Sequence, residues 1–313
     1  MPEAVSTNPT RGIALKIASV AVFMAMVTCI KLVSIHVPTG EAVFFRSFFA
    51  IPVILVWLWL RHDLKDGLKT ANPMGHLWRG LVGGTAMALS FTALGLLPLP
   101  EVTAIGYASP LLVIIFAAMF LGETVRMYRL GAVMLGLVGV LIVLAPRFST
   151  LSVEDASKLE TVGAMAMLLA AVFMALATIF VRKMVQTEQT AAIVFYFSLT
   201  CTVLSLLTIP FGWVLPTARE AALLVAAGLL GGFAQILLTT SYRHAEAAVI
   251  APFEYTSMLL ALVIGYSLFG EVPTSAMLWG AALVVSAGLF IIWREHRLGL
   301  ERGKARKVMT PQG

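Results

Sequence analysis

The feature that most constrains this chain is a series of ten apolar runs, each about long enough to cross a lipid bilayer as a helix. Spanning the hydrocarbon core takes about 20 residues at a rise of about 1.5 Å per residue. The runs cover residues 13–35, 41–60, 77–97, 101–121, 127–146, 162–181, 190–213, 220–242, 248–269 and 275–293. Because a backbone in lipid must satisfy its own hydrogen bonds, the runs predict an all-α integral membrane protein with ten transmembrane helices.

Composition leaves little room for a soluble domain. Hydrophobic residues make up 59% of the chain and charged residues 12%, whereas soluble proteins carry about 25% charged residues. The formal charge of +6 does not indicate a nucleic-acid partner, because the basic residues gather between the apolar runs, as topology signals do. Cys29 and Cys201 fall inside apolar runs, which favours buried free thiols over a disulfide or metal site.

The distribution of lysine and arginine predicts the orientation in the membrane. The side of the N-terminus holds Arg11, Lys16, Arg61, Lys65, Lys69, Arg79, Arg126, Arg129, Arg182, Lys183, Arg243 and the six basic residues from Arg294 to Lys307. The other side keeps Arg147, Lys158 and Arg219. The positive-inside rule therefore places both termini in the cytoplasm, in a bacterial-type inner membrane, with residues 294–313 as a basic cytoplasmic tail.

The chain repeats itself with an offset of 148 to 150 residues. The sequence AVFMA occurs at 21–25 and at 171–175, and the matched positions also include Gly80, Gly83 and Gly84 with Gly228, Gly231 and Gly232, and Gly122-Glu123 with Gly270-Glu271. Each copy holds five runs, and an odd number reverses the direction of the second copy. We therefore predict two inverted five-helix repeats, 12–146 and 162–293, with substrate bound between them near the midplane.

These features resemble the drug/metabolite transporter superfamily, EamA branch, which includes YddG-type amino-acid exporters. The resemblance lies in the 5+5 duplication, in the LGE and FGE endings at 121–123 and 269–271, and in the segments 109–123 and 252–271. It implies that the first four helices of each half surround a central cavity, that the fifth and tenth support it, and that no cofactor is bound. Members transport amino acids, riboflavin, S-adenosylmethionine, sugars or drugs, so the resemblance leaves the substrate open.

Glu254 is the first candidate for a functional side chain. It lies inside the run 248–269, beside Tyr255 and two residues after Pro252. A carboxylate at membrane depth is costly and marks a functional site by default. It is a candidate ligand for a substrate ammonium group or a carrier of a coupling proton. The alternative is a structural carboxylate that bonds to a neighbouring helix or lies near the cytoplasmic face.

The other candidate substrate contacts come from both halves. Arg46 and Lys31 lie near the outer ends of their runs, where Arg46 can hold a substrate carboxylate in a two-pronged bond; the alternative is that both extend to the lipid headgroups. Tyr107 and Tyr255 are related by the repeat, and the alternative to substrate contact is a packed pair with satisfied hydroxyls. The remaining candidates on the helix faces are Gln235, Ser90 and Phe91.

A second group of residues is expected to act in gating or bending. Pro110 and Pro252 interrupt helical hydrogen bonding, and Gly84 and Gly232 permit close helix packing. Glu123 and Glu271 end their helices against the dipole, which predicts hydrogen bonds to the start of a neighbouring helix and a structural or gate-closing role.

The sequence predicts a transporter and not an enzyme, since it contains no phosphate-binding Gly-Lys-Ser/Thr loop, hydrolase elbow or zinc motif. We expect a secondary active transporter, an exporter of small metabolites such as aromatic or methionine-like amino acids, that works by alternating access. The alternatives are export of another metabolite or drug, such as riboflavin, S-adenosylmethionine or cationic drugs, and an uncoupled facilitator or channel. Expected partners are the small-molecule substrate and the lipid bilayer; the sequence specifies no oligomeric state.

Overall fold

The computed structural model describes residues 9–64, 66–121, 127–149, 155–185, 187–244 and 251–308. Within these ranges the chain forms helices and no strands. The helices are α1 (Pro9–Val33), α2 (Thr39–Phe48), α3 (Ala50–Leu60), α4 (Pro73–Leu96), α5 (Leu99–Gly106), α6 (Ala108–Leu121), α7 (Met127–Ser149), α8 (Asp155–Met184), α9 (Thr190–Leu206), η1 (Ile209–Phe211), α10 (Ala218–His244), η2 (Ala251–Tyr255), α12 (Thr256–Phe269) and α13 (Ser275–Val308).

The prediction of an all-α membrane protein is confirmed. Seven described segments are long and apolar enough to cross a membrane, with α2–α3 and α5–α6 each counted as one segment. Two shorter apolar helices, at 190–206 and 253–269, add two spans. The tenth is α4, which is 24 residues long and less apolar because it carries glycines, His76 and Arg79.

Three spans are interrupted where a proline removes a backbone donor. Pro52 and Pro110 lie three residues after the interruptions at Phe49 and Tyr107, so each lacks the N–H that would bond four residues back. The ninth span begins as the 3-10 helix η2, which contains Pro252. Tyr107 and Tyr255, matched in the repeat, stand at two of these interruptions and have similar backbone angles (φ −68°, ψ −5°; φ −68°, ψ −12°).

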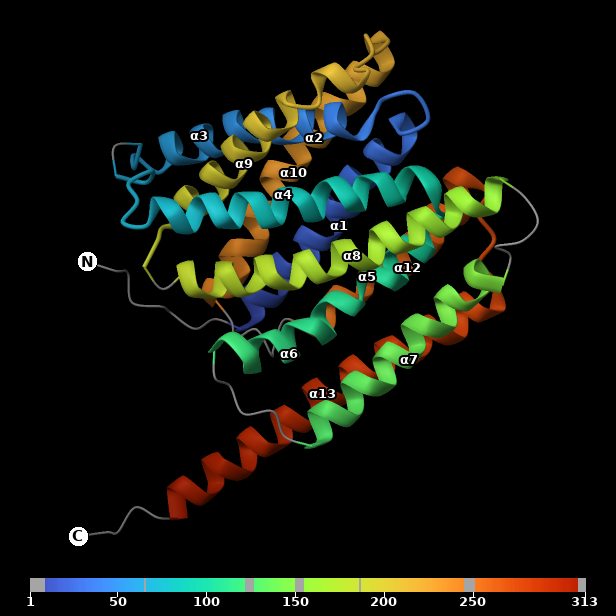
Figure 1. The fold of residues 1–313 in the computed structure, drawn as a ribbon. Coiled ribbons are helices and arrows are strands. Elements are labelled where there is room, and N and C mark those ends of the chain that lie inside the picture. The colour runs from blue at the N-terminus through green and yellow to red at the C-terminus, as the bar shows by residue number, and fades with distance from the viewer. Residues whose placement is uncertain are drawn as a thin grey trace.

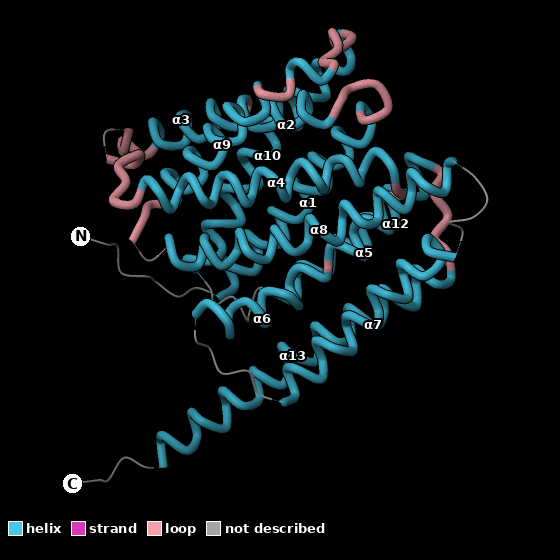
Figure 2. Tube along the Cα trace, viewed as in Figure 1, coloured by secondary structure: helices cyan, strands magenta, loops and turns pink. Residues whose placement is uncertain are grey.

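The helices lie side by side, with loops at the two ends of the bundle (Figures 1 and 2). We call the end at which α1 begins the N-terminal face and the opposite end the far face. The main neighbours are α1 with α10, α4 with α8, α2 with α9, α5 with α12, and α7 with α13. The last pair lies at one edge of the bundle (Figure 1).

The α7–α13 pair is held by close contact at two glycines. A Cβ built on Gly139 would lie 2.7 Å from the carbonyl oxygen of Gly280, and one built on Gly280 would lie 2.5 Å from that of Gly139. Small residues let helix backbones approach in this way. Helix α13 runs on to Val308, so the residues after Arg294, predicted only as a tail, continue the last helix; this stretch is rich in helix-forming residues and lacks proline up to Val308.

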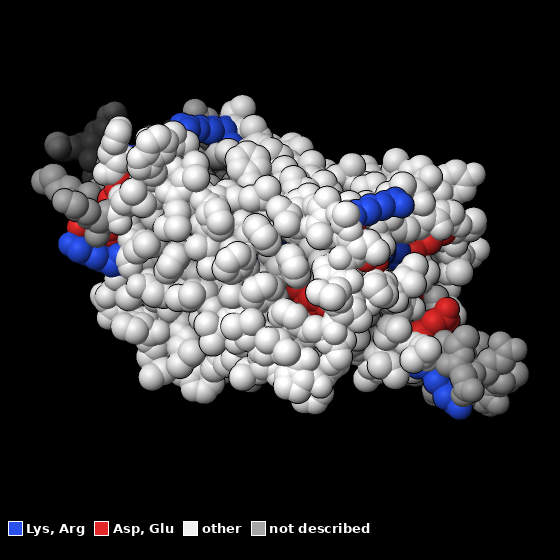
Figure 3. Space-filling model, turned by 90° about the horizontal axis from the view of Figure 1, so that it is seen from above, with Lys and Arg blue, Asp and Glu red and all other residues white. Residues whose placement is uncertain are grey.

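The surface agrees with a bilayer environment. Figure 3 shows a broad face of uncharged side chains, with lysine, arginine, aspartate and glutamate mainly toward its two ends. Large apolar side chains are exposed along the helices, among them Leu141, Val263 and Trp279. Lipid hydrocarbon is the environment in which such a surface is stable.

Candidate functional site

Glu254 forms an ion pair with Lys16 of α1. The Lys16 side chain is 3% exposed and that of Glu254 is 45% exposed, so the costly charge at this place is the lysine. Lys16 was predicted only as an orientation signal. Its position inside the first run, as the fourth residue of 13–35, was the available sign that it lies at membrane depth.

A second ion pair joins α1 to the ninth span at the far face. Lys31 Nζ lies 2.8 Å from Glu271 Oε1, and it donates to the carbonyl oxygen of Leu97 at 2.6 Å. The other carboxylate oxygen of Glu271 accepts a hydrogen bond of 2.8 Å from the backbone N–H of Leu99, the first residue of α5. The predicted bond to a neighbouring helix start is therefore present at Glu271, while Glu123 lies outside the described residues.

The two ion pairs therefore fasten the same two segments at opposite ends. Helix α1 and the segment 251–269 both run from the N-terminal face to the far face and are in contact. Lys16 and Lys31 are separated by about 22 Å of helix at 1.5 Å per residue. We call Lys16–Glu254 the N-terminal latch and Lys31–Glu271 the far latch.

The repeat-related tyrosines meet between these latches. Their ring centroids lie 5.0 Å apart with an interplanar angle of 69°, an edge-to-face contact. The hydroxyl of Tyr107 is 2.7 Å from Ser257 Oγ, and the Tyr107 side chain is buried. Tyr255 packs against Gly288 of α13, where a Cβ would overlap its hydroxyl. The structure thus brings the predicted pair together as a packed contact, and their contact with substrate stays a prediction.

Arg46 lies inside the protein, so the alternative in which it extends to the headgroups is wrong. Its residue exposure is 4%, because α2 turns it inward against α9. Its guanidinium carbon lies 5.5 Å from the centroid of the Phe197 ring, and that of Arg79 lies 3.9 Å from the same ring. Lys31, the other candidate near the outer end of its run, has Glu271 as its partner.

Arg79 was predicted only as a cytoplasmic orientation signal, and the structure adds that its side chain is buried. It is 6% exposed. The nearby Gly83 provides the space, because a Cβ at that position would overlap Arg79 Nη1, and the Phe197 face attracts the cation. An arginine inside an apolar run, as the third residue of 77–97, was the signal in the sequence.

The other predicted residues are spread over the bundle. Phe91 is buried in the main core, whereas Ser90 and Gln235 are half-buried. Gly84 and Gly232 lie at packing distance from Cys201 of α9 and Ala50 of α3. The prolines mark interruptions: Pro110 is exposed on the first turn of α6, and Pro252 lies in η2. Their roles in binding or gating stay predictions.

Glu188, which lies between two apolar runs and was not predicted as a site residue, is a buried carboxylate at the N-terminal face. Glu188 Oε1 accepts hydrogen bonds from Thr70 Oγ1 at 3.0 Å and from the backbone N–H groups of Ala71 at 2.9 Å and Asn72 at 3.0 Å. His76 Nε2 lies 3.4 Å from Glu188 Oε2. This cluster ties the loop before α4 to the loop before α9.

Stability is expected to depend on the charge of Glu188. Burial acts to raise its pKa, but the hydrogen bonds from Thr70, Ala71 and Asn72, with the contact from His76, outweigh burial, so the pKa lies below its ordinary 4.5. A lowered folded-state pKa stabilises the protein above the ordinary value, and this stabilisation is lost as pH falls through the folded-state pKa.

We therefore expect Glu188→Gln to lower the melting temperature at pH 7 and to reduce the further fall in melting temperature as the pH drops from about 5 to about 3. Thermal unfolding of the purified protein across this pH range measures both effects. An unchanged pH slope in the variant would contradict the assignment.

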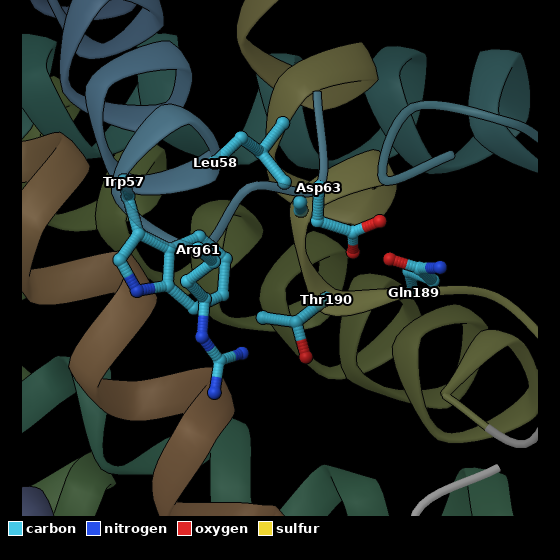
Figure 4. A pocket seen from close by; sticks show the side chains of 7 residues that line it. Trp57, Leu58, Arg61, Asp63, Gln189 and Thr190 are labelled. Carbon is cyan, nitrogen blue, oxygen red and sulfur yellow. The ribbon is translucent and has the colours of Figure 1, made fainter. Parts of the chain in front are cut away.

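A small pocket opens beside this cluster. Figure 4 shows side chains from the end of α3 and the start of α9 around it. It is lined by Trp57, Leu58, Arg61, Asp63, Gln189, Thr190 and Ala191. It lies apart from the latches and the tyrosines and contains none of the predicted site residues, so it is not assigned as the transport site.

Comparison with known proteins identifies the family to which the chain belongs. The chain matches the EamA-like transporter family over residues 10–145 and 161–293. It is 30% identical over 257 residues to an S-adenosylmethionine uptake transporter of Rickettsia bellii, covering 82% of this chain and 84% of that protein. It is 32% identical over 280 residues to the pseudopaline exporter CntI of Pseudomonas aeruginosa, covering 88% and 94%.

A solved crystal structure shares the fold, with a TM-score of 0.67 over 92% of this chain and 99% of that chain at 20% identity. The family match extends over most of the sequence and includes both latches and the tyrosine pair. The chain is therefore a member of the EamA-like transporter family, a multi-pass membrane transporter of small molecules.

Proposed function

We propose that the chain is a secondary active transporter that moves a small organic metabolite by alternating access. The observation that carries the proposal is the pair of latches that fasten α1 to the ninth span, one near each face. Opening one latch while the other stays closed would expose a site between them to one side of the membrane at a time. The interruptions at Tyr107 and in η2 supply bending points near the same two segments.

We further propose that the halves 12–146 and 162–293 are inverted repeats. Exchanging the halves turns the α1–α10 contact into the α8–α4 contact, and it keeps the α2–α9, α5–α12 and α7–α13 pairs. The observed neighbours support this two-fold relation, and transporters built from such repeats bind their substrate between the repeats. On the positive-inside rule, both termini lie in the cytoplasm of the cell inner membrane.

Amino acids, including aromatic and methionine-like ones, are the proposed substrates and export is the proposed direction. The relative that transports S-adenosylmethionine supports a solute with a methionine moiety. The relative that exports pseudopaline, 32% identical over 280 residues, supports export. Riboflavin, S-adenosylmethionine itself and cationic drugs are the alternatives, and an uncoupled facilitator is the alternative mechanism.

Counterflow in proteoliposomes tests the proposal. Vesicles loaded with unlabelled methionine, phenylalanine or S-adenosylmethionine are diluted into a trace of the labelled solute. A carrier that alternates is expected to accumulate label transiently, well above protein-free vesicles, and an uncoupled channel gives equilibration without an overshoot. Lys31→Met should remove the overshoot, and Arg61→Gln, an exposed residue stacked on Trp57, should retain it. Absence of counterflow for all three solutes would reject the proposed substrates.

A further inference from the structure

Two buried arginines lie together without a described carboxylate. Arg46 of α2 and Arg79 of α4 are 4% and 6% exposed. Neither takes part in the ion pairs found among the described residues. Arg46 Nε and Arg79 Nε and Nη1 are buried without a hydrogen-bond partner. Burying an unpaired charge costs free energy. An arginine does not avoid this cost by losing its proton, because its guanidinium group stays charged in proteins.

The residues around the two arginines are arranged to accommodate both side chains. Both guanidinium groups lie over one ring, that of Phe197 on α9. The neighbouring titratable group that acts on both is the thiol of Cys201, which does not neutralise them. Two glycines make room for the side chains, because a Cβ on Gly83 would overlap Arg79 and one on Gly231 would lie 3.0 Å from Arg46 Nε.

We infer that Arg46 and Arg79 form an oxyanion subsite that binds the carboxylate of the transported solute. The two guanidinium groups supply buried N–H donors without partners, and guanidinium N–H groups are the donors that proteins use to bind carboxylates and phosphates. The subsite lies where α2, α4 and α9 meet, a different helix crossing from the tyrosine pair at α5 and α12. The inference rests on the proposed transport function and narrows its substrates to solutes that carry an anionic group.

The inference has a consequence for stability that needs no knowledge of the substrate. An arginine retained for a ligand leaves the empty protein with an uncompensated charge, so Arg79→Met and Arg46→Met should leave the melting temperature unchanged or raise it. If the two arginines serve only to hold α2, α4 and α9 around Phe197, both substitutions should lower the melting temperature by several degrees.

The binding test compares each acid with its own amide. Thermal shifts and competition against labelled solute are measured on the purified full chain with methionine, phenylalanine and S-adenosylmethionine, each beside its carboxamide, and with inorganic phosphate and sulfate. The wild type should prefer the acid by at least about tenfold. Arg46→Met and Arg79→Met should abolish that preference, Arg79→Lys should retain part of it, and the control Arg61→Met should retain all of it.

Three results overturn the inference: a lower melting temperature in both single variants, no wild-type preference for any acid over its amide, or a preference that survives loss of both arginines. Stabilisation by phosphate or sulfate that exceeds every carboxylate would overturn the assignment to a carboxylate. Counterflow without a preference for the acid would reject the subsite and support the transport proposal. A preference for the acid without counterflow would support the subsite and reject the transport proposal.

Discussion

Replacing Glu254 with glutamine is expected to destabilise the protein more than any other single change at the latches. The substitution removes the Glu254 carboxylate from its ion pair with Lys16, whose side chain is 3% exposed. Removing one partner of a buried ion pair costs about 3–5 kcal/mol. Because Glu254 is itself half-exposed, we expect about 3 kcal/mol and a clear fall in melting temperature.

The reverse substitution should cost much less. Lys16→Met removes the buried charge and fills its place with an apolar chain of similar length, and it leaves Glu254 at a position that solvent reaches in part. The double variant Lys16→Met with Glu254→Gln should recover most of the stability that Glu254→Gln loses. A double-mutant cycle from thermal unfolding measures the coupling.

The exposed Asp66–Lys69 pair provides the matched control. Asp66→Asn should change stability by less than about 1 kcal/mol, since exposed ion pairs contribute little. Equal losses from Lys16→Met and Glu254→Gln, with no recovery in the double variant, would contradict the view that the lysine is the costly charge. Retention of full pH-driven transport by Glu254→Gln would also reject a proton-carrying role for Glu254.

The second large effect is expected at the far latch. Lys31→Met removes the ion pair to Glu271 and the hydrogen bond to Leu97 together, so the closed state of the far face loses several interactions and the open state loses none. A weakening of about 1.4 kcal/mol changes the population of the open state about tenfold. We expect at least that increase in exposure of the far-face interior.

Labelling of an introduced cysteine measures this exposure. Thr92, half-buried on α4 with its hydroxyl 3.2 Å from that of Thr39, is replaced by cysteine in a chain where Cys29 and Cys201 are alanine. A membrane-impermeant maleimide should react faster at this position after Lys31→Met. Lys16→Met should slow it, because weakening the N-terminal latch favours the opposite opening.

Exchange of the charges provides a further check. Lys31→Glu with Glu271→Lys should not restore the closed state, because the new glutamate would face the carbonyl oxygen of Leu97 and the new lysine would face the N–H of Leu99. Faster labelling in both the Lys16 and the Lys31 variant would indicate general loosening and would contradict alternating latches.

Local chemistry made part of this protein predictable. The lengths of the apolar runs determine ten helices, because lipid offers no partner for a free backbone donor. Pro110 and Pro252 predicted bending points, and the chain is interrupted at Tyr107 and in η2. The position of Glu271 after an apolar run predicted a hydrogen bond to a neighbouring helix start, and Leu99 provides it.

The pairing of charges was decided only by the tertiary structure. From the sequence, Lys16 and Arg79 were interpreted as topology signals. In the structure both are buried, Lys16 against Glu254 and Arg79 against Phe197. Which lysine meets which glutamate depends on helix rotation and on neighbours more than 200 residues apart, which no local pattern encodes. The sequence determined the helices because the bilayer constrains each one separately. The site depended on how the helices pack, because the role of a buried charge depends on the partner that the fold places beside it.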